Sequence, residues 1–130
     1  MKDALVSYRL EQAEVSLKEA VLLLNTGKSF RGAVNRDYYA MFYAVLALLS
    51  KSGGASSRHS GIIGRFDKNF VKKGVFSKEM SKDLHRAFDL RQMSDYRELF
   101  NLNEKDAREI IQSSQKFVKA IKEYLQEHAD

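Results

Sequence analysis

The sequence contains no cysteine and no proline, and only seven of its 130 residues are glycine. The absence of cysteine excludes disulfide bonds, thiol catalysis and metal sites with cysteine ligands. Because proline and glycine interrupt helices, their scarcity favours long, continuous helices over a β fold with many turns. The chain is therefore expected to be helical, and its chemistry to depend on other side chains.

Long apolar segments are absent as well. The longest uncharged apolar run, YYAMFYAVLALL, covers residues 38–49, whereas a membrane-spanning helix needs ~20 such residues. The first residues carry charges throughout and lack the apolar core of a signal peptide. We therefore expect a cytoplasmic protein without membrane contact. The length of 130 residues predicts one domain, which covers residues 1–130.

Apolar residues recur at steps of three and four along most of the chain, which is the spacing of one helix face. This pattern predicts five helices, at about residues 3–25, 29–51, 59–72, 77–91 and from 103 to the end. Gly27 is expected to end the first of them as a left-handed cap, and Gly74 to end the third. Ser77 and Asn103 are expected to cap the last two. The predicted fold is all-α, an up-and-down bundle of four to five helices.

The second predicted helix is apolar on most sides, so we place it at the centre of the bundle. One of its faces carries small residues, which would let a neighbouring helix approach closely, and one acid interrupts them. This row consists of Ala33, Asp37, Ala40, Ala44 and Ala47. We expect Asp37 to be partly buried and to need a cationic or hydrogen-bonding partner.

The formal charge of +5 is concentrated in one part of the chain. Residues 58–86 hold eight basic and three acidic residues, so this segment alone accounts for the whole net charge. Its basic residues, called the basic surface below, are Arg58, Arg65, Lys68, Lys72, Lys73, Lys78, Lys82 and Arg86. Such asymmetry is typical of proteins that bind polyanions. A solvated, lysine-rich helical hairpin would show the same pattern.

The stretch RQMSDY, residues 91–96, places polar groups close to an apolar helix face. Arg91 presents a rigid fork of donors suited to carboxylates and phosphates, and near the core it must be paired. Asp95, one helical turn further on, and Asp37 are the available acids. Two interpretations stay open, a structural ion pair and a polar binding site that also includes Tyr96.

His59 stands at the expected start of the third helix, beside Arg58. It is interpreted either as a capping or solvent-facing residue or as a proton donor or acceptor near neutral pH. In the aromatic run of the second helix, Tyr38 and Tyr39 point to different sides. At least one of their hydroxyl groups is expected to reach a polar neighbour. We predict no metal site and no cofactor.

Four stretches resemble the HEPN domain family, in particular its stand-alone archaeal and bacterial branch. They are AVNRDYYAMFYAVLALL (33–49), SSRHSGIIGRFDKNFVKKG (56–74), RQMSDY (91–96) and DAREIIQSSQKFVKAI (106–121). The resemblance implies a helical bundle that forms homodimers and works with a minimal nucleotidyltransferase partner, often as a toxin–antitoxin pair. It also implies that Arg91 corresponds to the arginine of the motif that makes many HEPN proteins metal-independent endoribonucleases.

The histidine of that motif has no counterpart, because residues 96–98 are Tyr, Arg and Glu. We therefore expect a HEPN-type binding module for nucleotide or RNA, with a ligand site formed by Arg91, Asp95, Tyr96, Asp37 and His59. The alternative is a ribonuclease toxin in which Arg91 acts with His59 or Asp95. A structural subunit without a ligand is a third hypothesis.

Overall fold

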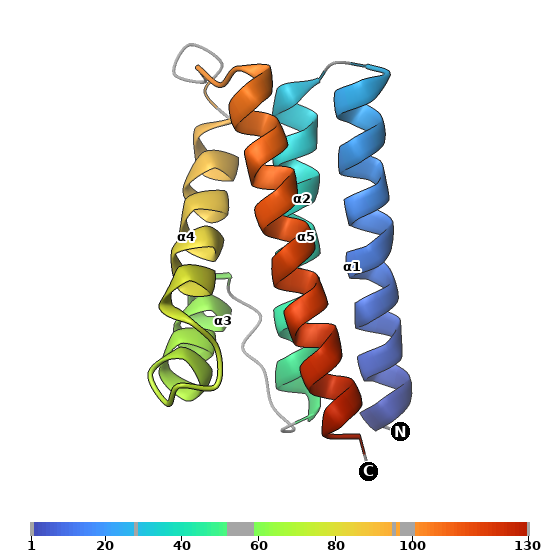
Figure 1. The fold of residues 1–130 in the computed structure, drawn as a ribbon, viewed down its shortest axis with the longest axis vertical. Helices are drawn as coiled ribbons and strands as arrows, with labels where there is room; N and C mark the ends of the chain where they lie inside the picture. Colours follow the sequence, from blue (N-terminus) through green and yellow to red (C-terminus); the bar gives the residue numbers. More distant parts are fainter. Residues whose placement is uncertain (1, 28, 52–58, 95, 97–100, 130) are drawn as a thin grey trace.

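The computed structural model describes residues 2–27, 29–51, 59–94, 96 and 101–129. In this part of the chain the elements are five α-helices and one π-helical turn, with no strand. They are α1 (Lys2–Asn25), α2 (Phe30–Lys51), α3 (His59–Phe66), η1 (Asp67–Val71), α4 (Lys78–Met93) and α5 (Glu104–Glu127). The four long helices run along the long axis of the molecule, as Figure 1 shows. The predicted all-α bundle is confirmed.

Helix α2 is the central helix, as its composition predicted. Twelve of its 22 residues are buried, and α1, α3, α4 and α5 all pack against it. Removing apolar surface from water lowers the free energy of the folded protein. The helix that is apolar on most sides therefore occupies the middle of the bundle. One chain is sufficient to cover it, so the composition of α2 gives no argument for a second chain.

Local sequence signals set most helix ends. The Ser77 side chain accepts a hydrogen bond from the Met80 N–H, and the Asn103 side chain accepts one from the Asp106 N–H. Both are the predicted N-caps. Gly74 has a φ of +80°, a conformation that residues with a Cβ seldom adopt.

The prediction that Gly27 ends α1 in a left-handed conformation is wrong. Its φ lies outside the left-handed region, unlike that of Gly74. The Leu22 carbonyl instead accepts bonds from the N–H and the hydroxyl of Thr26, at 2.9 and 2.6 Å. The Leu23 carbonyl accepts one from the Ser29 N–H at 2.9 Å. Since these donors satisfy the terminal carbonyls, no left-handed residue is required.

The third predicted helix changes character partway. It is α-helical to Phe66 and then widens into the π-helical turn η1. At this point Asp67 bonds to two side chains of α4, and the rings of Phe66, Phe70 and Phe76 pack together. Periodicity alone predicts a continuous α-helix here, and the widened turn directs Asp67 to α4.

Candidate functional site

Three helices bring together a cluster of one cation and four rings, called the Arg91 cluster below. It consists of Tyr38, Tyr39 and Phe42 on α2, His59 at the start of α3 and Arg91 near the end of α4. The guanidinium of Arg91 donates a hydrogen bond to the Tyr39 hydroxyl over 3.2 Å. Its central carbon lies 5.5 and 5.9 Å from the ring centres of Tyr39 and Tyr38, which are cation–π distances.

His59 is joined to the same cluster through Tyr38. Its Nδ1 lies 2.7 Å from the Tyr38 hydroxyl, and its ring stacks on Phe42 with the centres 4.2 Å apart. Burial raises the pKa of Tyr38, so its hydroxyl keeps its proton. Burial, and then the charge of Arg91, lower the pKa of His59 below 6.5. The imidazole is therefore neutral at pH 7, and its tautomer sets whether Nδ1 or the Tyr38 hydroxyl donates in this hydrogen bond.

No carboxylate pairs with Arg91 among the residues that the structure describes. Asp95, the first of the two expected acids, lies outside these residues. Arg91 is half-buried, and the hydrogen bond that its side chain makes with another described residue goes to the Tyr39 hydroxyl. A guanidinium has five N–H donors, so most of them have no partner among the described residues.

Asp37, the second expected acid, forms no ion pair with Arg91. It is 0% exposed, and neither carboxyl oxygen has a hydrogen-bond partner in the described part of the chain. Burial raises its pKa to about 8, and the charge of Arg91, which acts on Tyr38 and His59, does not act on Asp37. The expected cationic or hydrogen-bonding partner is not found among the described residues. A cation is not required, because a carboxyl that is protonated at pH 7 has no charge to pair.

Asp37 belongs to a polar level inside the bundle. Ser16 on α1, Asp37 on α2 and Ser114 on α5 are all buried, and each lies between residues of two separate apolar clusters. The Ser114 hydroxyl donates to the backbone carbonyl of Asp37 over 3.1 Å. The Asp37 carboxyl is thus enclosed where α1, α2 and α5 meet, and it is not accessible to a ligand.

Tyr96, at the end of the RQMSDY stretch, is 63% exposed. Its backbone N–H bonds to the Met93 carbonyl, and its ring makes none of the ring contacts of the Arg91 cluster. Of the five predicted ligand residues, the structure thus brings together Arg91 and His59. Sequence reasoning did not assign Tyr38, Tyr39 and Phe42 to the site, although the paired tyrosines carried a signal, since both hydroxyls reach polar neighbours.

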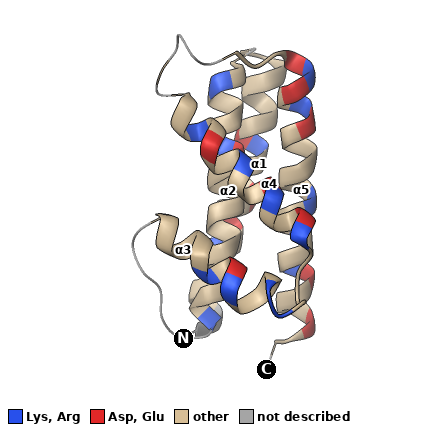
Figure 2. Cartoon of the chain, turned by 90° about the vertical axis from the view of Figure 1, so that its left-hand side faces the viewer, with Lys and Arg blue, Asp and Glu red and all other residues tan. Residues whose placement is uncertain are grey.

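The basic surface covers η1, the turn after it and α4. Arg65 is partly buried and Arg58 lies outside the described residues, whereas the other six side chains are exposed. These six are Lys68, Lys72, Lys73, Lys78, Lys82 and Arg86. Figure 2 looks onto the side of the molecule that α3 and α4 form, where lysine and arginine segments recur along the ribbon. The cations that lie close together in the sequence are therefore exposed to solvent on η1, the turn after it and α4.

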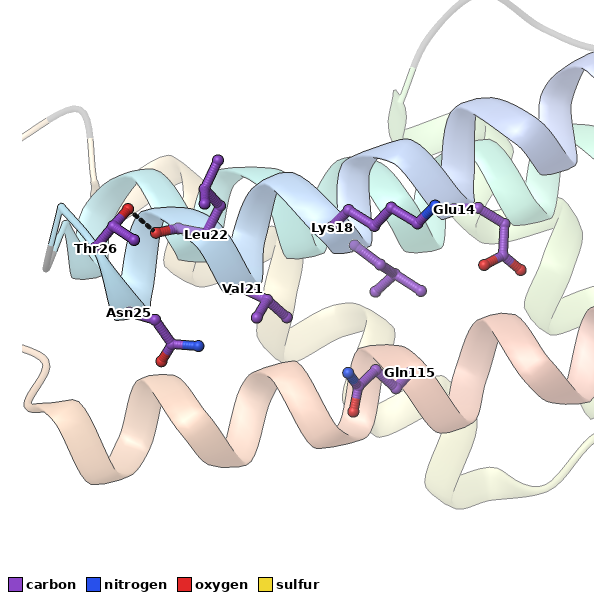
Figure 3. Close-up of a pocket in the computed structure, with 8 residues that line it drawn as sticks. Glu14, Lys18, Val21, Leu22, Asn25, Thr26 and Gln115 are labelled. Atoms are coloured by element: carbon purple, nitrogen blue, oxygen red, sulfur yellow. Dashed lines mark hydrogen bonds between the residues drawn. The ribbon is translucent and has the colours of Figure 1, made fainter.

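A separate groove of about 600 Å³ lies between α1 and α5. Figure 3 shows Val21 of α1 and Gln115 of α5 facing each other across it. Its lining is apolar at Leu17, Val21 and Leu22 and polar at its rim. None of the predicted site residues lines it.

Comparison with known proteins identifies the family. The model of the HEPN domain matches residues 6–124. The chain belongs to the HEPN domain family. A UPF0332 protein of Thermotoga maritima is 36% identical to this HEPN protein over 126 residues, which are 97% of this chain and 95% of the relative.

Two proteins of Methanocaldococcus jannaschii are further relatives of this HEPN chain. The one named "Putative toxin MJ0142" is 32% identical, over 89% of this chain and 78% of the relative. The one named "Putative toxin MJ0605" is 33% identical, over 91% and 87%.

Two further findings concern the described residues of this HEPN chain. They contain no helix that is long and apolar enough to cross a membrane. They also contain no group of three or more histidine or acidic side chains that could hold a metal ion.

Proposed function

We propose that this HEPN protein is a binding module for the phosphate groups of a nucleotide or RNA, and that Arg91 is its central ligand residue. The observation that carries the proposal is the state of the guanidinium. Arg91 is half-buried against Tyr38 and Tyr39, but no described carboxylate neutralises it. A fixed arginine with free donors is suited to bidentate phosphate recognition.

The neighbouring side chains support this role. Tyr39 fixes the guanidinium through one hydrogen bond, so less side-chain entropy is lost when an anion binds. The neutral His59 belongs to the same cluster, and its imidazole is a second polar group for a ligand. The rings of Tyr38 and Phe42 are buried, so they hold Arg91 and His59 in position.

The basic surface extends the proposed site to a longer polyanion. Six exposed cations on η1, the following turn and α4 would contact successive phosphates, and RNA binding would then weaken steeply as salt increases. Affinity that is insensitive to salt would exclude this face as the phosphate-binding surface.

The proposed biological setting is a toxin–antitoxin-like system. Two relatives carry the word toxin in their names, and the resemblance to the stand-alone HEPN branch implies a homodimer that works with a minimal nucleotidyltransferase. We propose these partners for this chain, in the cytoplasm. Co-purification of the two proteins after co-expression would test the pairing.

Substitution of Arg91 tests the ligand role. Arg91→Ala should reduce binding of nucleotide, RNA or the partner at least tenfold, while unfolding stability falls by only roughly 1 kcal/mol, because a partly hydrated arginine over tyrosines contributes little to folding. Arg91→Lys should rescue little, since a point charge does not reproduce the planar fork.

Arg108→Ala is the matched control, because Arg108 is an exposed arginine on α5 that pairs with Glu104. Calorimetry and binding titrations on the same preparations separate the two roles. A large loss of stability with unchanged binding would make Arg91 a structural residue.

A metal-independent endoribonuclease is the second candidate function. One observation favours it, namely that an imidazole lies next to Arg91 although the motif histidine is missing. In this reaction the RNA 2′-hydroxyl loses its proton and attacks the adjacent phosphorus. The P–O5′ bond breaks, which leaves a 2′,3′-cyclic phosphate and a protonated 5′-hydroxyl. Arg91 would stabilise the charge and His59 would take part in proton transfer. Cleavage of RNA by the wild-type protein that His59→Ala abolishes would favour the enzyme over the binding module.

A further inference from the structure

A second histidine is held in a defined position on the basic surface. The carboxylate of Asp67, the first residue of η1, bonds to two side chains of α4. One oxygen accepts the Ser81 hydroxyl hydrogen over 2.7 Å, and the other lies 2.6 Å from His85 Nε2. The two contacts join residues 14 and 18 positions apart in the sequence, so they form only when η1 docks on α4.

The exposed edge of His85 lies among cations. Its side chain is 51% exposed, and its Nδ1 makes no hydrogen bond or ion pair with another described residue. Lys82 and Lys78 precede it by three and seven residues, which places all three side chains on one face of α4. Asp67 is the charged residue in contact with the imidazole. Lys68 follows it on η1, and Lys82, Arg86 and Asp89 lie within about one turn of His85 on α4.

The contact with Asp67 decides what Nδ1 can do. Because the carboxylate accepts a hydrogen from Nε2, the neutral imidazole presents a bare lone pair at Nδ1, which repels a phosphate oxygen. Protonation puts a hydrogen on Nδ1, and both ring nitrogens become donors. The imidazolium can then donate to the acid on one side and to an anion in solvent on the other.

We propose that His85, oriented by Asp67, forms a phosphate subsite with Lys82 and Lys78, and that this subsite binds the RNA backbone only when the imidazole is protonated. This inference rests on the proposed RNA binding at the basic surface. The subsite is separate from the Arg91 cluster, whose own histidine is neutral at pH 7.

The test measures binding of an oligouridine with hydroxyl ends, whose backbone charge is constant between pH 5.5 and 7.5. One added contact to a single strand steepens the dependence of log affinity on log salt by ~0.7. In ~0.1 M salt this corresponds to roughly fivefold tighter binding at pH 5.5 than at pH 7.5. Circular dichroism at both pH values confirms that each variant is folded.

Two substitutions imitate the neutral and the protonated state of His85. His85→Gln should keep the weaker affinity and the shallower salt slope at both pH values, whereas His85→Lys, a permanent cation, should bind tightly at both. His128→Gln is the matched control and should keep the wild-type difference, because His128 is exposed at the far end of α5 and bonds to the Tyr124 carbonyl.

Several results would overturn the subsite. If His85→Gln and His85→Lys lose affinity equally at both pH values, the contact with Asp67 only holds η1 against α4. If His59→Gln removes the pH difference and His85→Gln does not, the titrating group belongs to the Arg91 cluster. If binding depends on salt but does not change with pH, the His85 subsite is rejected and the proposed RNA binding is retained. A lack of binding at pH 5.5 in low salt rejects the RNA function together with it.

Discussion

Asp37 shows how a single buried acid sets the response of the fold to pH. Its pKa rises from 3.8 to about 8 on folding because the bundle removes it from water. The folded protein therefore holds this proton more tightly than the unfolded chain. The resulting stability is complete below about pH 4 and is lost as pH rises toward 8, by ~1.4 kcal/mol for each pH unit.

We therefore expect Asp37→Asn to stabilise the protein at pH 7 and above, by several kcal/mol near pH 8. The amide is neutral at every pH, so the fall in stability between pH 5 and 8 should largely disappear. Urea unfolding curves over this range measure both effects, with Asp89→Asn as an exposed control. A variant that is no more stable than the wild type would show that water or a rearranged side chain solvates the carboxylate.

At the scale of the elements, two glycines with similar surroundings have opposite roles. A Cβ added at Gly64 or at Gly74 meets no atom within 4 Å, so neither position excludes a side chain by contact. Gly64 lies inside α3, whereas Gly74 has a φ of +80° between η1 and α4. Backbone conformation alone distinguishes the two positions.

Gly74→Ala should therefore destabilise the protein by about 1–2 kcal/mol, since an L residue in the left-handed region is strained. Gly64→Ala should stabilise it by up to ~1 kcal/mol, because alanine is the better helix former. Chemical unfolding midpoints of the two variants measure the difference. Changes of the same sign in both would refute the conformational account of the turn that leads into α4.

At the scale of the whole molecule, α1 carries several exposed apolar residues that a second copy could cover. Its large exposed apolar residues are Leu5, Tyr8, Val15 and Leu22. A step of seven residues returns to the same helix face after two turns, so Tyr8, Val15 and Leu22 form one stripe that is symmetric about Val15. A two-fold axis through Val15 would place Tyr8 of each copy against Leu22 of the other.

We predict a homodimer of twice the 14.9 kDa chain mass that uses this stripe. Sedimentation equilibrium at micromolar concentrations should show the dimer for the wild type and the monomer for Val15→Glu, which buries a charge at the axis. Lys119→Glu, an exposed change on α5, should leave the mass unchanged. A wild-type protein that sediments only as a 14.9 kDa species would reject the dimer.

The sequence by itself determined the features that depend on near neighbours. Helix spacing, the central place of α2, the caps at Ser77 and Asn103 and the turn at Gly74 all follow from residues within one or two helical turns. The basic surface was also predictable, because its cations are adjacent in the chain. The error at Gly27 shows the limit, since either a left-handed glycine or bonds from Thr26 and Ser29 can satisfy the same carbonyls.

Only the tertiary structure decided which distant side chains meet. Arg91 reaches Tyr39 across 52 residues, His59 reaches Tyr38 across 21, and His85 reaches Asp67 across 18. Such pairs depend on how the helices rotate and dock, which periodicity does not specify. The sequence placed Asp37 near the core but not in a seam without partners, because the cost of burying a carboxyl is set by all three helices that enclose it.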